Sequence, residues 1–202
     1  KLFEAVFYSL LQQCEQLEPG RKKRFRFNNK LYSIDASVID LCISMFDWAH
    51  FRKTKGAIKL HLMLDHDGYL PCFANITDGK THEVTIAQDM RFQPGSIIAM
   101  DRGYIDYDLF YRWTQEKVYY VTRTKSNMRY EVIKTLPFPS GKNIISDEII
   151  KFTLPDSQKK CPVPQRRTVV WDEKNQREIE LLTNVFKLAA STISAMRDKK
   201  DS

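Results

Sequence analysis

The sequence predicts an α/β fold, with helices packed on a sheet that mixes parallel and antiparallel strands. Apolar residues recur at helical spacing in 2–17 and 106–117, while apolar and polar residues alternate in 58–64, as in a half-buried strand. A turn signal joins that strand to another at 69–77, so these two strands are expected to form an antiparallel hairpin. Strand and helix patterns then alternate as far as residue 125.

The first helix is expected at Leu2–Leu17 and ends before Pro19 and Gly20. A run of basic residues with interleaved aromatics, 21–27, follows it. This run is as compatible with a solvated loop as with contacts to a DNA backbone.

A short apolar strand, 31–37, comes next and contains one acid, Asp35. A buried carboxylate is costly unless it is paired, hydrogen-bonded or bound to metal, so Asp35 requires an explanation. After this strand, Ser37 is expected to cap a helix that runs to about Met45.

Beyond the hairpin, a helix is expected to begin at Thr81. The strand Ser96–Met100 then runs directly into a second acid, Asp101, where the chain must turn. The helix over 106–117 and a β-branched and aromatic strand at 118–122 follow. We expect the two acid-bearing strands to lie side by side, with their acids sharing a divalent cation.

Helical periodicity disappears from about residue 126, where prolines separate short β-prone runs. Residues 167–171 and 177–183 are expected to form a hairpin, and helical spacing returns only at 188–196. The predicted organisation has four parts: an N-terminal helix and basic linker at 1–30, a core at 31–125, a β-rich insertion at 126–184, and the start of a final core helix at 185–202.

The composition favours a globular protein that binds a polyanion. The 202 residues are 43% hydrophobic and carry a net charge of +7. Four widely spaced cysteines form no Cys-x-x-Cys pair, so neither a zinc ribbon nor a redox motif is indicated. No apolar run reaches the roughly 20 residues of a membrane-spanning helix, and no signal peptide is recognised. We therefore expect a cytoplasmic protein without membrane contacts.

Two acids on neighbouring strands suit phosphoryl transfer with two metal ions, which stabilise the attacking and leaving oxygens. Magnesium fits this chemistry because it prefers hard oxygen ligands and keeps part of its water shell. By residue type alone, however, structural roles are favoured: Asp35 would cap the helix predicted after it, and Asp101 would form a turn or an ion pair with Arg102.

Several runs of the sequence resemble the insertion-sequence IS4 family of DDE transposases. They occur in the family's order and cover most of residues 31–125: Tyr32–Cys42, Lys55–His61, Asp67–Pro71, Thr77–Glu83 and Met100–Tyr104. A looser likeness continues through the β-rich region to residues 188–193.

This resemblance implies a ribonuclease-H-like mixed sheet with two parallel acid-bearing strands, an antiparallel hairpin, flanking helices and a β-rich insertion. It also implies that Asp35 and Asp101 are the first two catalytic acids and metal ligands, with Mg²⁺ as cofactor and Mn²⁺ as its substitute. In the implied reaction, water attacks to nick the transposon end, and the freed 3′-hydroxyl then attacks a phosphodiester.

The family's third acid is a Glu in a Tyr, Arg, Glu, Lys signature, on the helix that follows a pair like Thr192-Ile193. No residue of this chain matches that Glu. Without a third carboxylate the second metal is poorly held, so strand transfer is expected to be lost or severely weakened. We therefore expect a transposase core fragment that is truncated before its third acid, with a segment also missing upstream of Lys1.

Further site residues follow from the same resemblance. His61 and His82 lie in matching runs and are candidates for positions near the site, although a structural or exposed role is at least as well supported for each. Contacts with the DNA backbone are expected of five basic residues: Lys55, Lys59, Arg102, Arg123 and Lys125. A solvated rim is the alternative for each.

Three functions remain open from the sequence. The first is a transposase core that cleaves DNA and transfers strands, and the second is a DNA-binding remnant without chemistry. The third is a metal-dependent nuclease of the same fold. The expected partners are transposon ends and target DNA, with a homodimer in the full-length protein, and the expected location is the bacterial cytoplasm, in association with the nucleoid.

Overall fold

The computed structural model describes residues 2–17, 27–41, 50–52, 55–138 and 143–198. The chain divides into two compact units, 1–89 and 90–202, each with its own strands and helices. Most of the basic run, 21–26, and the predicted helical stretch beyond residue 41 lie outside the described residues. The four-part division predicted from the sequence remains a prediction.

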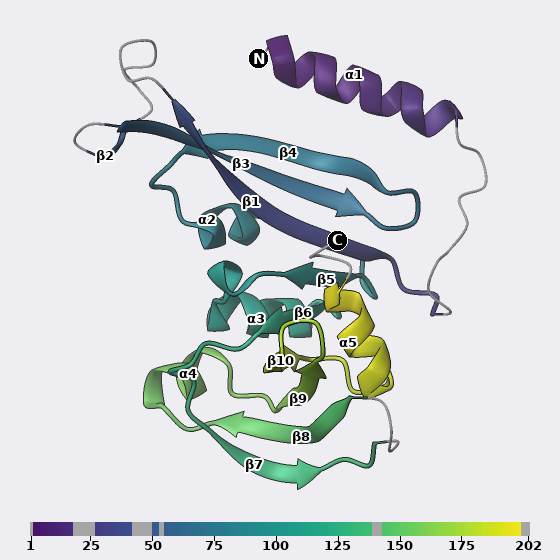
Figure 1. The fold of residues 1–202 in the computed structure, drawn as a ribbon, viewed down its shortest axis with the longest axis vertical. Coiled ribbons are helices and arrows are strands. Elements are labelled where there is room, and N and C mark those ends of the chain that lie inside the picture. The colour runs from purple at the N-terminus through teal and green to yellow at the C-terminus, as the bar shows by residue number, and fades with distance from the viewer. Residues whose placement is uncertain (1, 18–26, 42–49, 53–54, 139–142, 199–202) are drawn as a thin grey trace. The chain divides into compact units, whose positions relative to one another are not determined.

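The described residues of the first unit form antiparallel strands together with the helices α1 and α2 (Figure 1). β3 (Lys55–Asp65) is its central strand and pairs with β1 (Leu31–Leu41), β4 (Leu70–Asp78) and the short β2 (His50–Arg52). α1 (Leu2–Leu17) contacts β4, and α2 (Glu83–Asp89) follows the loop after β4. The predicted hairpin and both predicted helices are therefore confirmed.

The helix predicted from Ser37 is wrong over the described residues. β1 continues to Leu41, and Val38 and Ile39 lie opposite Lys59 and Ile58 of β3. β-branched side chains favour extended backbone, and pairing with β3 satisfies the backbone groups of these residues. A neighbouring strand thus overrides the local capping signal of Ser37.

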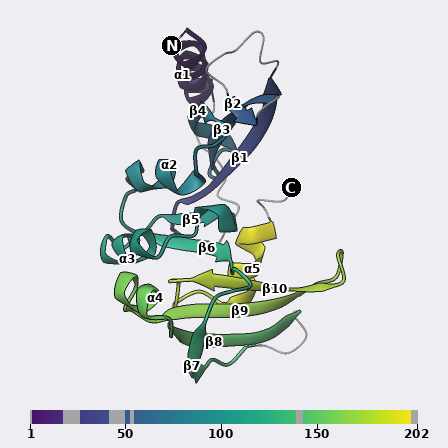
Figure 2. The same cartoon turned by 90° about the vertical axis from the view of Figure 1, so that its left-hand side faces the viewer.

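The second unit contains a mixed sheet with the strand order β5-β6-β10-β9-β8-β7 (Figure 2). The strands are β5 (Ile97–Met100), β6 (Tyr119–Arg123), β7 (Tyr130–Thr135), β8 (Ile144–Phe152), β9 (Gln165–Asp172) and β10 (Arg177–Thr183). β5 and β6 are parallel, and the other neighbouring pairs are antiparallel. The predicted 167–183 hairpin and the mixed α/β class are confirmed.

In the part of the second unit that the structure describes, the α-helices α3, α4 and α5 accompany this sheet. α3 (Tyr107–Gln115) connects β5 to β6, α4 (Pro155–Lys160) connects β8 to β9, and α5 (Ala190–Asp198) packs against β5, β6, β8 and β9. The sequence pattern missed α4 because six residues are too few to show helical periodicity. Its start signals are Pro155 and the acidic Asp156 in the first turn.

The core of the second unit lies on both sides of β6. The ring of Tyr120 stacks on Phe110 of α3, with centroids 3.9 Å apart and planes inclined by 14°. β10 pairs with β6 through Leu181–Thr183. The β-rich region therefore continues the sheet that contains β5 and β6.

No helix among the described residues is long and apolar enough to cross a bilayer.

Candidate active site

Asp35 lies near the middle of β1, opposite Leu62 of β3. Its neighbours Ser33 and Ile34 are buried, but Asp35 itself is exposed. Its Oδ1 accepts the backbone N–H of Ala36 at 2.9 Å. The expectation of a desolvated acid on a core strand is therefore wrong, because Asp35 is exposed although Leu31 and Ser33 on the same face of β1 are buried.

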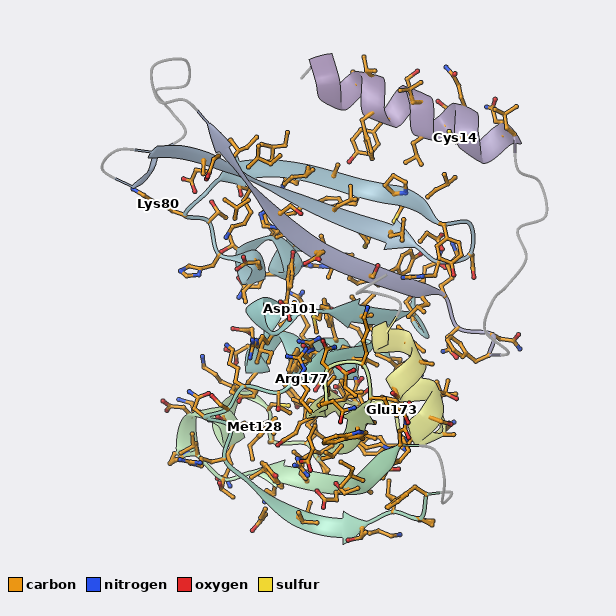
Figure 3. The ribbon with its side chains drawn as sticks, viewed as in Figure 1. Cys14, Lys80, Asp101, Met128, Glu173 and Arg177 are labelled. Atoms are coloured by element: carbon orange, nitrogen blue, oxygen red, sulfur yellow. The ribbon has the colours of Figure 1, made fainter. Side chains whose placement is uncertain are left out.

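Asp101 directly follows β5, all four residues of which are buried (Figure 3). Asp101 is exposed, and its Oδ1 accepts the backbone N–H of Arg102 at 2.8 Å. This hydrogen bond caps the 3₁₀ turn η2 (Arg102–Tyr104). Asp101 thus occupies a turn, as its residue type allowed, and the turn fixes its carboxylate at the carboxyl end of β5.

Basic residues share this edge of the sheet with Asp101. Parallel pairing sets Met100 beside Thr122, so β5 and β6 end at the same edge. Arg102 follows β5 there and is exposed, while Arg123 ends β6 and is half-buried. Lys125 lies two residues further on, and its Nζ is 3.5 Å from the carbonyl oxygen of Ile105. In open α/β sheets, the carboxyl ends of the strands are the usual ligand-binding edge.

Lys59 and His61 lie on the opposite face of the first unit's sheet from Asp35. Asp35 is opposite Leu62, and side chains alternate between faces, so residues 59 and 61 project to the other side. Lys59 is 8% exposed, and its Nζ donates to the Thr81 carbonyl at 2.7 Å and to Glu83 Oε1 at 2.9 Å. This position favours a structural role for Lys59 over the expected DNA contact.

His61 is fully buried, with its Nε2 3.0 Å from Thr77 Oγ1. Burial lowers the pKa of His61, the nearby ammonium of Lys59 lowers it further, and Glu83 acts in the opposite direction. The imidazole is therefore neutral near pH 7. Its burial on the face away from Asp35 favours a structural role over the expected position near the site.

The remaining predicted residues are less constrained by the structure. His82 is exposed, immediately before α2. Lys55 begins β3, but its side chain lies outside the described residues. Roles for His82 near the site and for Lys55 in DNA contact remain predictions.

The Lys59–Glu83 pair gives a testable pH dependence. Burial raises the pKa of Glu83, but hydrogen bonds from Lys59 and the backbone, together with the charges of Lys59 and His61, lower it below the ordinary value of 4.5. A lowered carboxyl pKa stabilises the fold above the unfolded-state pKa, and this contribution is lost as the pH falls through the folded-state pKa. In urea titrations, the stability difference between wild type and Glu83→Gln should be constant above about pH 5 and shrink below pH 4.5. A pH-independent difference would contradict the assignment.

Sequence reasoning missed two polar clusters. Asp78 accepts hydrogen bonds from Lys80 N, Thr81 N and Thr81 Oγ1, and so orders the loop before α2. The Asp-Gly-x-Thr spacing was an available signal for this turn. In the second unit, Arg166 and Asp147 form a buried ion pair. Only the presence of two charges within β-prone runs pointed to it.

Among the residues that the structure describes, no group of three or more His, Cys, Asp or Glu side chains is arranged to hold a metal ion. Of the two acids that the sequence singled out as metal ligands, Asp35 belongs to the first unit and Asp101 to the second.

Comparison with known proteins decides the family. The family model described as "Transposase DDE domain" matches residues 28–199, which include both aspartates. The chain belongs to this family. The match confirms that the sequence resemblance to DDE transposases was correct, and membership of the IS4 group stays a prediction.

Two curated proteins that resemble the chain are also named as transposases. A transposase homologue of Sinorhizobium fredii, y4zB, is 28% identical over 180 residues, which are 87% of this chain and 50% of the relative. The transposase assigned to insertion sequence element IS5377 of Geobacillus stearothermophilus is 24% identical over 180 residues, 89% of this chain and 47% of the relative. The chain spans about half the length of these relatives.

Solved structures with a looser likeness include two nucleases. The NurA nuclease from Sulfolobus solfataricus aligns with a TM-score of 0.41 at 9% identity, covering 96% of this chain and 82% of the nuclease. Endonuclease V from Bacillus subtilis aligns with a TM-score of 0.33 at 6% identity, covering 96% of this chain and 81% of that one.

Proposed function

We propose that this DDE domain is the catalytic core region of an IS4-type transposase, which cleaves DNA and transfers strands by metal-dependent phosphoryl transfer. The observation that carries the proposal is the family match over residues 28–199, together with exposed carboxylates at both aspartates expected to be catalytic. In this proposal, Asp35 and Asp101 are the first two catalytic acids and metal ligands.

The two aspartates suit magnesium by their chemistry. Each presents a solvated carboxylate, and each has Oδ1 directed by the backbone N–H of the next residue. Hard oxygen donors of this kind are the ligands that Mg²⁺ prefers, and Mn²⁺ accepts the same donors. When bound, the cations supply Lewis-acid stabilisation of the attacking and leaving oxygens.

The chain's own basic residues have a separate task. Arg102, Arg123 and Lys125 lie at the edge where β5 and β6 end, beside Asp101. Positive side chains there would hold a phosphodiester backbone without reading its sequence. Transposon ends and target DNA are the proposed ligands, and binding should weaken steeply as salt rises.

The lack of a match to the family's third acid limits the activity expected of Asp35 and Asp101 alone. No residue of the chain matches the Glu of the Tyr, Arg, Glu, Lys signature. Two carboxylates can bind a cation, but they hold a second one poorly. We therefore propose measurable metal binding and weak or absent strand transfer for this chain by itself.

Metal binding tests the proposal directly. Titration of the chain with MnCl₂ or MgCl₂ in a calorimeter should give a saturable heat, and Asp35→Asn or Asp101→Asn should reduce the affinity at least about tenfold, because each substitution removes one charged ligand.

Two substitutions serve as matched controls for this titration. Asp40→Asn removes another exposed acid from β1, on the opposite face from Asp35, and Asp156→Asn removes an exposed acid from the second unit. Neither control should change the heat. A heat that persists in both Asp35→Asn and Asp101→Asn would refute the proposed site.

A DNA-binding protein without chemistry is the second candidate. It is favoured by the net charge of +7 and by the basic edge formed by Arg102, Arg123 and Lys125. Salt-dependent DNA binding without any metal heat would support it. Nicking of plasmid DNA without joining of strands would instead support the metal-dependent nuclease.

A further inference from the structure

A buried arginine connects the β-rich region to the segment that leads into α5. Arg166 of β9 is 3% exposed. Its Nε donates to Asp147 Oδ1 at 2.8 Å and its Nη2 donates to Asp147 Oδ2 at 2.6 Å. Both carboxylate oxygens of the buried Asp147 on β8 accept hydrogen bonds from Arg166, so the paired strands β8 and β9 fix the plane of the guanidinium group.

The third nitrogen of Arg166 points to the chain between β10 and α5, residues 184–189, here called the lead-in segment. Nη1 donates to the carbonyl oxygens of Val185 at 3.0 Å and Leu188 at 2.7 Å, with Phe186 at 3.4 Å. These carbonyls lie just before α5 begins at Ala190. The arginine therefore supplies hydrogen bonds to the backbone at the point where the chain enters the helix.

The side chain of the first lead-in residue, Asn184, also anchors the segment. Asn184 is 4% exposed, and its Oδ1 accepts the N–H of Tyr120 at 3.0 Å. Its Nδ2 donates to the carbonyl of Val118 at 3.0 Å and to Thr114 Oγ1 at 2.9 Å. Asn184 thus ties the segment to β6 and α3, while Arg166 ties it to β8 and β9.

α5 itself is held mainly by apolar packing. Ala190, Ile193 and Met196 are 3% exposed or less and follow one another at a spacing of three residues along one face. That face packs on β5, β6, β8 and β9. Apolar packing is not directional, so a short helix of this kind can slide or rotate unless its start is fixed.

We propose that Arg166, oriented by Asp147, is a positioning residue. It fixes the start of α5 against the sheet that contains β5, the strand directly before Asp101. The inference rests on the proposed function for its catalytic meaning, because the resemblance places the third acid on this helix. It assigns a task to the paired strands β8 and β9, which is to hold the start of the helix that follows the β-rich region.

Hydrogen exchange of the full chain, followed by mass spectrometry of peptides covering 184–198, tests the brace without DNA or metal. The key variant is R166M/D147L, which replaces the pair by apolar side chains and leaves no buried charge. It should unfold at a urea concentration close to that of wild type, while amides of 189–198 exchange at least about tenfold faster, because charged hydrogen bonds to the lead-in carbonyls are lost. Peptides from β6 should be unchanged.

A conservative substitution and its neighbour provide the controls. Arg166→Lys keeps the charge beside Asp147, but one ammonium cannot reach both Asp147 and the carbonyls, so exchange in α5 should rise by a smaller factor. Arg167→Lys is the matched control, because Arg167 projects to the other face of β9 and binds Glu148 and Glu180. It should leave α5 unchanged.

Two results would overturn the inference. Wild-type exchange in α5 of R166M/D147L would show that the pair does not hold the helix. Faster exchange spread evenly over the second unit would show a general loss of stability rather than a local brace. Either result would leave the metal titration of Asp35 and Asp101 unaffected, so the two proposals fail separately.

Discussion

Asp147→Ala is expected to lower the free energy of unfolding of the second unit by about 3–5 kcal/mol, the range measured when one partner of a buried ion pair is removed. The side chains of Asp147 and Arg166 are 2% and 4% exposed, so the substitution leaves a guanidinium without its counterion and out of reach of bulk water. Thr168 also loses the carboxylate oxygen to which its hydroxyl donates at 3.2 Å. Urea unfolding, followed through the fluorescence of Trp113 and Trp171, measures the loss.

The control for Asp147→Ala is Asp108→Ala, in α3 of the same unit. Asp108 pairs with Lys160 at 3.3 Å, and the two side chains are 62% and 49% exposed, so this ion pair is solvated. Exposed pairs contribute little, so the urea midpoint should barely move. Equal losses in the two variants would show that Asp147 is not buried as the structure indicates.

Lys59→Met is expected to destabilise the first unit by about 1–3 kcal/mol, because the carboxylate of Glu83 and the carbonyl of Thr81 lose a charged donor. The affinity of the Lys59→Met variant for duplex DNA should equal that of the wild type, because the Lys59 ammonium is held inside the first unit by Thr81 and Glu83. Urea unfolding measures the first effect, and fluorescence anisotropy at several salt concentrations measures the second.

Lys125→Met is the counterpart to Lys59→Met. Lys125 is exposed at the basic edge beside Asp101, so its loss should weaken DNA binding and lower the salt slope by about 0.9 while leaving stability nearly unchanged. If Lys59→Met weakened DNA binding as much as Lys125→Met, a purely structural role for Lys59 would be refuted.

The sequence predicted those elements whose patterns are local and long enough to repeat. The alternation over 58–64 predicted β3, and the turn signal after it predicted the pairing with β4. β1 beyond Ser37 was mispredicted because its extended backbone depends on β3, a partner that a local pattern does not include. α4 was missed because its six residues show no period.

Local sequence patterns also placed only some of the candidate site residues correctly. Asp101 was predicted correctly as an acid at a strand end, because an apolar run visibly stops there. His61 was predicted near the site and Lys59 in contact with DNA, but the alternation of side chains along β3 puts both on the face opposite Asp35. Arg166 and Asp147 are 19 residues apart, and only the pairing of β8 with β9 brings them together.

The pairing of β10 with β6 has a consequence for how the second unit folds. β6 ends at Arg123, and its neighbour β10 begins only at Arg177, so that edge of β6 stays open until the whole β-rich region has been synthesised. Contacts of such long sequence separation close late and slowly. A chain shortened to residue 125 would leave the edge of β6 free to pair with other chains. The region from 126 to 183 is thus a folding partner of the strands that present Asp101, and the acid-bearing edge cannot be separated from it as an independent module.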